Sequence, residues 1–283
     1  MNLRVAVVAD RVSWEERQLI AAAPDANLEL TWVNDESLCL GAEGAPALAA
    51  YDAVLVRSRS YTRGGLIATA AEAAGVRVCN AAKAIRACEN KLELRTEMHR
   101  AGIPAADHRL VLSRRDFELA LGQIPPPFVL KPIYGGMGKR VTLVRTADTA
   151  QSVYDYVEDL GHGFEQAMLV EPFLDGGTSI RCFVVGREIV AAAEFASAGG
   201  DWRSNAALGN QTRALPRDPA LAKIVDDVVD VLGPGVYGID LFRSGGDLIV
   251  NEVNHAPAFR AVAESTGVDV PRAIVNHLRE ELS

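Results

Sequence analysis

The segment "DLIVNEVNHAP", residues 247 to 257, places acidic and amide side chains in a run that otherwise reads as a buried strand. Alternate residues of a strand point to the same face, so Leu248, Val250, Glu252 and Asn254 are predicted to share one face. Burying an unpaired carboxylate there would cost several kcal/mol. We therefore expect Glu252 to face a positive charge.

The preceding run "VYGIDLFR" ends in "SGGD", a glycine-rich link of the kind that joins a hairpin. If Ser244 pairs with Leu248, Asp240 lies opposite Glu252, and two such carboxylates repel unless a cation separates them. Carboxylates and an amide carbonyl are hard oxygen ligands that suit magnesium. The pattern predicts a metal site at Asp240, Glu252 and Asn254. The alternatives are a solvent-exposed face of the hairpin or one protonated carboxylate.

Lysines and glycines elsewhere in the chain point towards a nucleotide. Lys131 closes the strand-like run "FVLK", and "GGMGKR" follows as a loop rich in backbone N–H groups that could wrap phosphates. A plain hairpin turn is the alternative. Neither a Walker A loop nor a G-x-G-x-x-G after the first strand is present. Lys91 lies one turn into a predicted helix, where an ordinary solvated lysine is equally compatible with the sequence.

The elements that must position these residues fall into two halves. An α/β layer with a parallel sheet is predicted over about the first 85 residues, because helical stretches separate short apolar runs at 3–9, 28–33, 51–57 and 76–79. An α+β half follows, with helices predicted at 89–101, 147–160, 219–232 and from Pro271, strands within 167–173, 179–186 and 188–195, and a hairpin at 236–253.

Composition bounds the class of protein. A chain of 283 residues with 49% hydrophobic residues can form two or three subdomains around one site. The net charge of -8 argues against a general nucleic-acid binder or a membrane-surface protein. The four cysteines show no C-x-x-C pair, and the apolar start is interrupted at Asp10, too early for a signal peptide or a membrane span. We expect reduced thiols and a cytoplasmic location.

Taken in order, Lys91 and seven motifs resemble those of ATP-grasp ligases, in particular the group containing LysX, ArgX and RimK: "VLKPIYGGMGKR", "VEPF", "SIRCFVVG", "DWRSN", "GIDLF", "NEVNHAP" and "STGVDVP". The resemblance implies an ATP-grasp fold with a Rossmann-like pre-ATP-grasp domain (1–85), a central lid (86–170) and a C-terminal subdomain with the metal site (171–283). It also implies ATP and two Mg²⁺ ions, for which Mn²⁺ could substitute, and a homodimer or homotetramer.

The resemblance further implies a reaction. An acyl phosphate would form from a carboxylate and ATP, and the α-amino group of an amino acid would then attack it. The donor would be the C-terminal glutamate of a small acidic amino-group carrier protein, as in LysX-like ligases. A carrier-free dipeptide ligase and a RimK-like ligase acting on a protein tail remain alternatives, as does a nucleotide-sensing protein without catalysis.

Residue roles follow from the resemblance by position. Nucleotide contacts are implied for Lys91, Lys131, Val170, Glu171, Ser179, Arg203, Ser204 and Asn205. Among these, the implied catalytic residues are Lys131, Arg203 and Asn205. The metal ligands would be Asp240, Glu252 and Asn254, and substrate contacts are expected at Arg57, Arg59, Arg181, Arg213, His255 and Phe259. For His255, deprotonation of the amine and simple packing of the loop are both open.

Some positions depart from the family pattern. Ser179 stands where an aspartate is usual before "IR", and Leu208 stands where a basic residue is usual, a role that Arg213 could take over. Ala258, Arg260 and Ala261 replace residues of the "EFKN" pattern of LysX-like sequences. An amino-acid substrate other than aminoadipate or glutamate is therefore an open possibility.

The run "VLVRSRSYTRGG" ends the third predicted strand of the first domain. Strand alternation sends Arg57 and Arg59 to one side, with Arg63 at the start of the next helix. Ligands of α/β sheets collect at the carboxyl ends of strands, and arginine suits a two-pronged grip on a carboxylate. We expect this patch to bind the acidic donor. The alternative is a solvated loop whose arginines pair with nearby acidic residues.

Overall fold

The computed structural model describes residues 3–136, 140–160, 167–174, 178–196, 202 and 211–283. Its helices are α1 (Trp14–Ala22), α2 (Arg63–Ala73), α3 (Ala82–Glu89), α4 (Lys91–Arg100), α5 (Arg114–Gln123), α6 (Ala147–Leu160), α7 (Pro219–Leu232), α8 (Arg260–Thr266) and α9 (Val270–Glu281), with short 3-10 helices η1 (Ala23–Ala26), η2 (Asp35–Ser37) and η3 (Pro46–Leu48). Its strands are β1 (Leu3–Ala9), β2 (Leu28–Asn34), β3 (Ala53–Val56), β4 (Arg77–Cys79), β5 (Arg109–Val111), β6 (Phe128–Pro132), β7 (Thr142–Val144), β8 (Met168–Pro172), β9 (Thr178–Gly186), β10 (Glu188–Ala196), β11 (Gln211–Ala214), β12 (Gly235–Ser244) and β13 (Asp247–Asn254).

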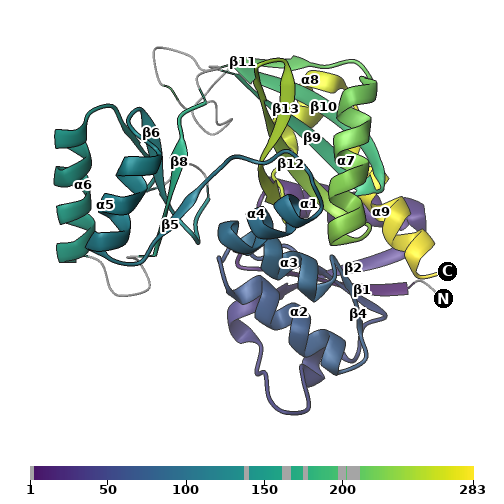
Figure 1. The fold of residues 1–283 in the computed structure, drawn as a ribbon. Coiled ribbons are helices and arrows are strands. Elements are labelled where there is room, and N and C mark those ends of the chain that lie inside the picture. Colours follow the sequence, from purple (N-terminus) through teal and green to yellow (C-terminus); the bar gives the residue numbers. More distant parts are fainter. Residues whose placement is uncertain (1–2, 137–139, 161–166, 175–177, 197–201, 203–210) are drawn as a thin grey trace.

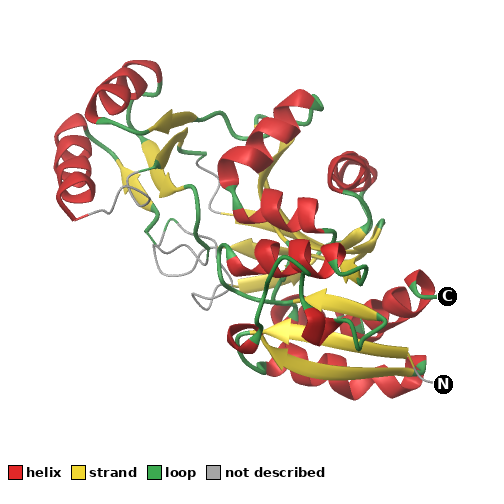
Figure 2. Cartoon of the chain, turned by 90° about the horizontal axis from the view of Figure 1, so that it is seen from below, coloured by secondary structure: helices red, strands yellow, loops and turns green. Residues whose placement is uncertain are grey.

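The N-terminal domain is built on a parallel sheet of order β2-β1-β3-β4, as predicted. Residues Val5–Ala9 are buried one after another because both faces of a parallel sheet are covered by helices. One face packs with α2 and α3, and the other packs with α1 and the C-terminal helix α9. The two ends of the chain lie on the same side of the molecule (Figures 1 and 2).

The central subdomain has an antiparallel sheet of order β5-β8-β6-β7 and stands to one side in both views (Figures 1 and 2). The helices α5 and α6 cover it, and Phe117 stacks on Tyr154 with ring centroids 4.3 Å apart. The boundary expected at residue 170 falls within β8, whose residues pair with β6. The helix α5 was not predicted from the sequence.

The C-terminal subdomain has an antiparallel sheet of order β11-β10-β9-β12-β13. One face packs with α7, and with residues of α3 and α4 that precede the central subdomain in the chain. The other face packs with α8 and α9 and with the N-terminal domain. Residues 82–100 therefore share a core with the C-terminal sheet, although their place in the sequence assigned most of them to the lid.

The hairpin β12–β13 corrects the predicted register. A two-residue turn at Gly245 and Gly246, both with positive φ, pairs Ser244 with Asp247, not with Leu248. A bulge at Asn251 then inserts one residue and shifts the pairing back by one.

The bulge places Asp240 opposite Glu252 as predicted, but for a different reason. It also reverses the alternation, so Leu248, Val250 and Val253 share the core beside α7. The predicted grouping of Glu252 with Val250 on one face is therefore wrong.

Two further expectations from the sequence bear on the environment of the protein. The four cysteines, all within the described ranges, are free thiols, as predicted. None of the helices that the structure describes has the length and hydropathy that a bilayer crossing requires.

Candidate active site

Arg181, Asp240 and Glu252 occupy one row across the neighbouring strands β9, β12 and β13. Arg181 donates two hydrogen bonds to Asp240, from Nε at 2.7 Å and from Nη2 at 2.6 Å, and Asn254 Nδ2 lies 3.4 Å from Asp240 Oδ2. Burial alone would lower the pKa of Arg181, but Asp240 and then Glu252 raise it. Arg181 is thus a positive charge of the kind that the sequence required beside these carboxylates.

The donor set of this row fits a magnesium ion. Two carboxylates and an amide from Asp240, Glu252 and Asn254 lie on adjacent strands, and the Asp240 side chain keeps 17% of its surface exposed. The residues that the structure describes include no cluster of three or more His, Cys, Asp or Glu side chains suited to a metal. Asn254 as a third ligand therefore stays a prediction.

A second cluster joins the central subdomain to α4. Glu171 on β8 is 4% exposed and accepts hydrogen bonds from Arg95 Nε and Nη2, both at 3.0 Å. Lys131 Nζ lies 2.6 Å from Glu171 Oε2, the oxygen that also accepts from Arg95 Nη2. Lys91, also buried, donates from its Nζ to the Gly135 carbonyl. Two buried cations therefore contact one buried carboxylate, and a third, Lys91, lies near enough for its charge to act on Lys131.

The electrostatics of this cluster favour an anion. Burial, together with the positive charges of Arg95 and Lys91, lowers the pKa of Lys131 to about 8 despite the opposing effect of Glu171. Burial would raise the pKa of Glu171, but Lys131 and Arg95 lower it, so this carboxylate stays charged. A polyphosphate would supply the negative charge that one shared carboxylate cannot.

Val170, Glu171 and Ser179, for which nucleotide contacts are implied, have different surroundings in the structure. Val170 has no exposed surface, packs in the core of the central subdomain and lies in β8 between β5 and β6, so this geometry offers no surface of Val170 to a nucleotide. The Glu171 carboxylate is occupied by Arg95 and Lys131, so the expected ribose contact is wrong in this geometry. Ser179 is half-buried on β9, two residues before Arg181 and hence on the same face.

Some predicted residues lie outside the described ranges. These are Arg203, Ser204, Asn205 and Leu208, together with Lys139 of the glycine-rich loop.

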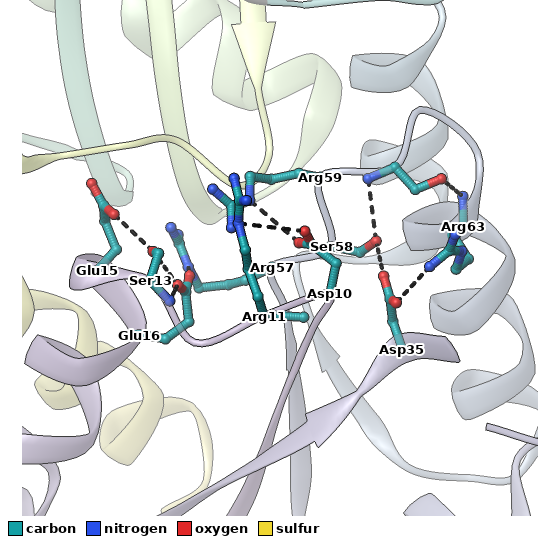
Figure 3. A network of polar contacts seen from close by, with 12 residues as sticks. Asp10, Arg11, Ser13, Glu15, Glu16, Asp35, Arg57, Ser58, Arg59 and Arg63 are labelled. Atoms are coloured by element: carbon teal, nitrogen blue, oxygen red, sulfur yellow. Dashed lines mark hydrogen bonds and ion pairs between the residues drawn. The ribbon is translucent and has the colours of Figure 1, made fainter. Parts of the chain in front are cut away.

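The arginines of the first domain do not form the predicted patch (Figure 3). Arg57 is 5% exposed, and its Nε donates to Glu16 Oε1 at 2.8 Å. Arg63 donates to the buried Asp35 at 2.6 Å. A buried and paired Arg57 is not free to bind a donor from solvent, so that expectation is corrected.

Arg59 and Arg63 both keep partly exposed side chains, but Arg63 is bound to the buried Asp35 and to Glu36, whereas Arg59 pairs only at longer range. Its side chain is 37% exposed and its Nε lies 3.3 Å from Asp10 Oδ1. Arg11, 70% exposed, lies 3.8 Å from the other oxygen of Asp10 (Figure 3). Two arginines that share one carboxylate leave a positive charge at the carboxyl end of β1.

Phe259 and Arg213 are two more of the predicted substrate residues. Phe259 has no exposed surface and packs edge-on against Trp14 and Phe183, so the expected substrate contact is wrong and Phe259 belongs to the core. Arg213 pairs with Glu194 at 2.7 Å.

Glu194 lies opposite Ile180, whose neighbour Arg181 points to the other face. Arg213 is therefore on the face of the sheet away from Asp240, and it does not take over the role expected of the residue at Leu208.

His255 follows directly after Asn254 and is nearly buried. Its Nε2 lies 3.7 Å from Glu89 Oε1, and its Nδ1 has no hydrogen-bond partner among the residues that the structure describes. Burial, then the charge of Arg57, lowers the pKa of His255 to about 4. Burial raises the pKa of Glu89 to about 7, although the N–H groups of Gly65 and Gly64 oppose this. A neutral, enclosed imidazole fits the packing interpretation of His255.

Sequence reasoning missed Arg95, Glu16 and Glu89. A signal existed for Arg95, because it follows Lys91 by four residues in "KLELR" and so shares its helix face. Glu16 and Glu89 gave no comparable signal, since their partners Arg57 and His255 are distant in the sequence.

Two family models together match nearly the whole chain. The model for the LysX pre-ATP-grasp domain matches residues 5–87, and the model for the RimK-like ATP-grasp domain matches residues 88–278. With the fold and the two charged clusters, these matches define the protein as an ATP-grasp ligase. More narrowly, the chain belongs to the RimK-like ATP-grasp family.

Individual relatives agree with this placement. The chain is 27% identical over 286 residues to "Glutamate--LysW ligase ArgX" of Sulfurisphaera tokodaii, covering 99% of this chain and 100% of that protein. It is 28% identical over 296 residues to a "Probable alpha-L-glutamate ligase" of Parasynechococcus marenigrum, covering 99% of this chain and 63% of that protein.

Solved structures agree as well. A RimK domain ATP-grasp protein of Sphaerobacter thermophilus has a TM-score of 0.83 at 27% identity, covering 97% of this chain and 98% of that one. D-cycloserine synthetase DcsG has a TM-score of 0.78 at 15% identity, covering 99% and 100%, and shows the fold alone.

Proposed function

We propose that this ligase uses ATP and Mg²⁺ to activate a carboxylate and joins it to the α-amino group of an amino acid. One observation carries the proposal: the cationic cluster reaches the strand that carries Glu252. Arg95 Nη1 donates to the Val250 carbonyl at 2.9 Å, and Lys131 Nζ lies 3.5 Å from Asn251 Oδ1. Groups suited to phosphates and groups suited to magnesium are therefore adjacent.

Each group has a part in the proposed chemistry. When bound, ATP and magnesium supply the γ-phosphoryl group that converts the donor carboxylate to an acyl phosphate with release of ADP; attack by the amine then forms the amide and releases phosphate. Lys91 and Lys131 would neutralise the phosphates, while Asp240, Glu252 and Asn254 would hold two magnesium ions. Arg181, beside Asp240, would stabilise charge that develops during transfer.

The proposed donor is the C-terminal glutamate of a small acidic carrier protein. Relatives named as glutamate–LysW ligases support it, and so does the surface charge of Arg11 and Arg59 at the carboxyl end of the first sheet. Relatives named as α-L-glutamate ligases favour a second candidate, a ligase for another peptide or protein tail. The proposal includes a homo-oligomer that acts in the cytoplasm.

The proposed function is tested by coupled assays of ADP and phosphate release across a panel of amino acids. The donors to compare are a small acidic carrier protein ending in glutamate, a synthetic acidic peptide ending in glutamate, and free glutamate. Release that needs both the carrier protein and one amino acid, with the matching mass increase on the carrier, is the expected result. Release with free glutamate alone would overturn the carrier-protein donor, and no release with any pair would overturn the activity.

A further inference from the structure

The loop His255–Phe259, here the 255–259 loop, joins β13 to α8. It follows Asn254 directly, so it begins where the proposed metal site ends. On the proposed function, the amine must attack beside the metal-bound phosphate, and this loop borders that place. What fixes the loop therefore bears on how the acceptor amino acid is held.

The N-terminal domain grips the backbone of this loop at two carbonyl groups. Arg57 Nη2 donates to the Pro257 carbonyl at 3.1 Å, across 200 positions of the sequence. Asn80 Nδ2 lies 3.5 Å from the His255 carbonyl.

The side chains of the loop are enclosed as well. The guanidinium of Arg57 lies over the ring of Phe259, 5.7 Å from its centroid, and Trp14 meets the same ring edge-on. Pro257 packs so closely on Gly238 that a Cβ there would lie 2.8 Å from Pro257 Cβ. The loop is thus pressed onto the strand that leads to the metal site.

Arg57 is itself held by Glu16, and both side chains are almost fully enclosed, at 5% and 4% exposure. Ser13 donates to Glu16 Oε2 from its backbone N–H at 2.8 Å and from its hydroxyl, which leaves Oε1 for Arg57 (Figure 3). Burial would raise the pKa of Glu16, but Arg57 and Ser13 lower it, so the pair is ionic.

A buried ion pair between a helix and a strand contributes little net stability, because well-packed apolar side chains of similar volume often stabilise the same contact as well or better. An apolar pair has no donor for the Pro257 carbonyl. The directed hydrogen bond from Arg57 to the loop is what the ion pair adds.

We propose that Glu16 and Arg57 are positioning residues that set the 255–259 loop for the acceptor amino acid. This step rests on the proposed function for the identity of the bound substrate, but not for the contact itself. It predicts that loss of the pair frees the loop and weakens use of the acceptor, while ATP binding is retained.

The first readout is hydrogen–deuterium exchange of the amides in residues 255–260, which requires no substrate. Arg57→Met, Glu16→Gln and the apolar double variant Glu16→Leu/Arg57→Met should exchange there about fivefold faster or more, the factor expected for one lost hydrogen bond. The double variant removes both charges, so it stays interpretable if a single variant leaves an unpaired buried charge and unfolds. Arg63→Met is the matched control, because Arg63 also pairs with a buried carboxylate but on the far side of Ser58 (Figure 3).

The second readout is steady-state kinetics on variants that melt like the wild type. The Michaelis constant for the acceptor amino acid should rise or kcat should fall, with the constant for ATP within about twofold of the wild type. Arg57→Lys should restore little of the lost activity, because the shorter side chain with a single ammonium group cannot donate to both Glu16 and the Pro257 carbonyl in the geometry of the guanidinium.

Some outcomes would overturn the proposal. They are wild-type exchange in a folded double variant, equal acceleration in Arg63→Met, and a double variant that does not fold. Inactivity of the wild type with every donor and amino acid would overturn the proposed function instead, and the exchange experiment would still test the pair.

Discussion

Nucleotide binding should draw one proton onto Lys131. In the free protein the pKa of this ammonium is lowered to about 8, first by burial and then by Arg95 and Lys91, which outweigh Glu171. A triphosphate placed among these three cations would favour the charged form and raise the pKa again. The bound state therefore holds more protons than the free state at every pH above about 8, and affinity should fall as pH rises through that value.

The magnitude follows from the shift. With a free-state pKa of about 8, Lys131 is roughly 90% deprotonated at pH 9 and roughly 10% at pH 7, so binding should take up about 0.9 and about 0.1 proton respectively. The dissociation constant should rise by about fivefold between pH 8 and pH 9, because the protonated fraction of the free protein falls from about one half to about one tenth. The lowered pKa also affects the stability of the free protein. Between pH 8 and pH 10.5 the unfolded chain keeps the proton on Lys131 whereas the folded chain loses it, so the free energy of unfolding should increase with pH over this range.

Isothermal titration calorimetry with a non-hydrolysable ATP analogue and magnesium measures this directly. At pH 9, the slope of observed enthalpy against buffer ionisation enthalpy gives the number of protons taken up. Lys131→Met should abolish the uptake and leave Glu171 paired with Arg95. Lys83→Met, at an exposed position of α3, should leave it unchanged. An uptake at pH 9 that equals the uptake at pH 7, or that survives Lys131→Met, would refute the assignment of the phosphates to this cluster.

Three further predictions concern the metal site, the donor and the fold. Glu252→Gln should cut phosphate release at saturating magnesium by about 100-fold with little change in melting temperature, and unchanged turnover would remove the metal assignment. Arg59→Ala should raise the Michaelis constant for an acidic donor but not for ATP, with donor binding weaker at higher salt; an effect on ATP alone would place the donor elsewhere. Gly44→Ala should cost roughly 1–3 kcal/mol in urea unfolding because the φ of +85° there favours glycine and a Cβ would lie 2.5 Å from the Ala70 carbonyl oxygen, whereas Gly122→Ala, with open space around it, should not destabilise.

The sequence predicted elements well where a hydrophobic period was strong. The strands of the first sheet, the helices α6 and α7 and the hairpin β12–β13 all lie where the pattern placed them, within one or two residues at most ends. The helices α3, α5 and α8 were missed; they are short, at 8, 10 and 7 residues, and such windows hold few turns in which a period can show. Length alone does not decide the matter, because the alanine-rich α1, of 9 residues, was found.

The pairing of Asp240 with Glu252 was predicted correctly, although the register assumed for the hairpin turn was wrong. The pairing of Asp240 with Glu252 required two departures from a simple hairpin, a turn one residue tighter than assumed and a bulge at Asn251. A turn and an alternation pattern can be read from neighbouring residues, but a bulge is fixed by what lies across the sheet. Here Lys131 approaches Asn251 and Arg95 takes the Val250 carbonyl, and both partners come from more than one hundred residues earlier in the chain.

The arginines of the first domain show that the sequence does not reveal which charged side chains are buried. From the sequence, Arg57 and Arg59 are equivalent: the same residue type, two positions apart, at the end of one strand. In the structure Arg57 is buried on Glu16 and holds the 255–259 loop, whereas Arg59 stays at the surface beside Asp10. The difference lies in Glu16, a side chain 41 positions earlier that is fixed by the cap of α1. The sequence therefore gives the number of arginines at the end of a strand. Which of those arginines can contact a ligand depends on the acidic residues of the helix that packs against the strand.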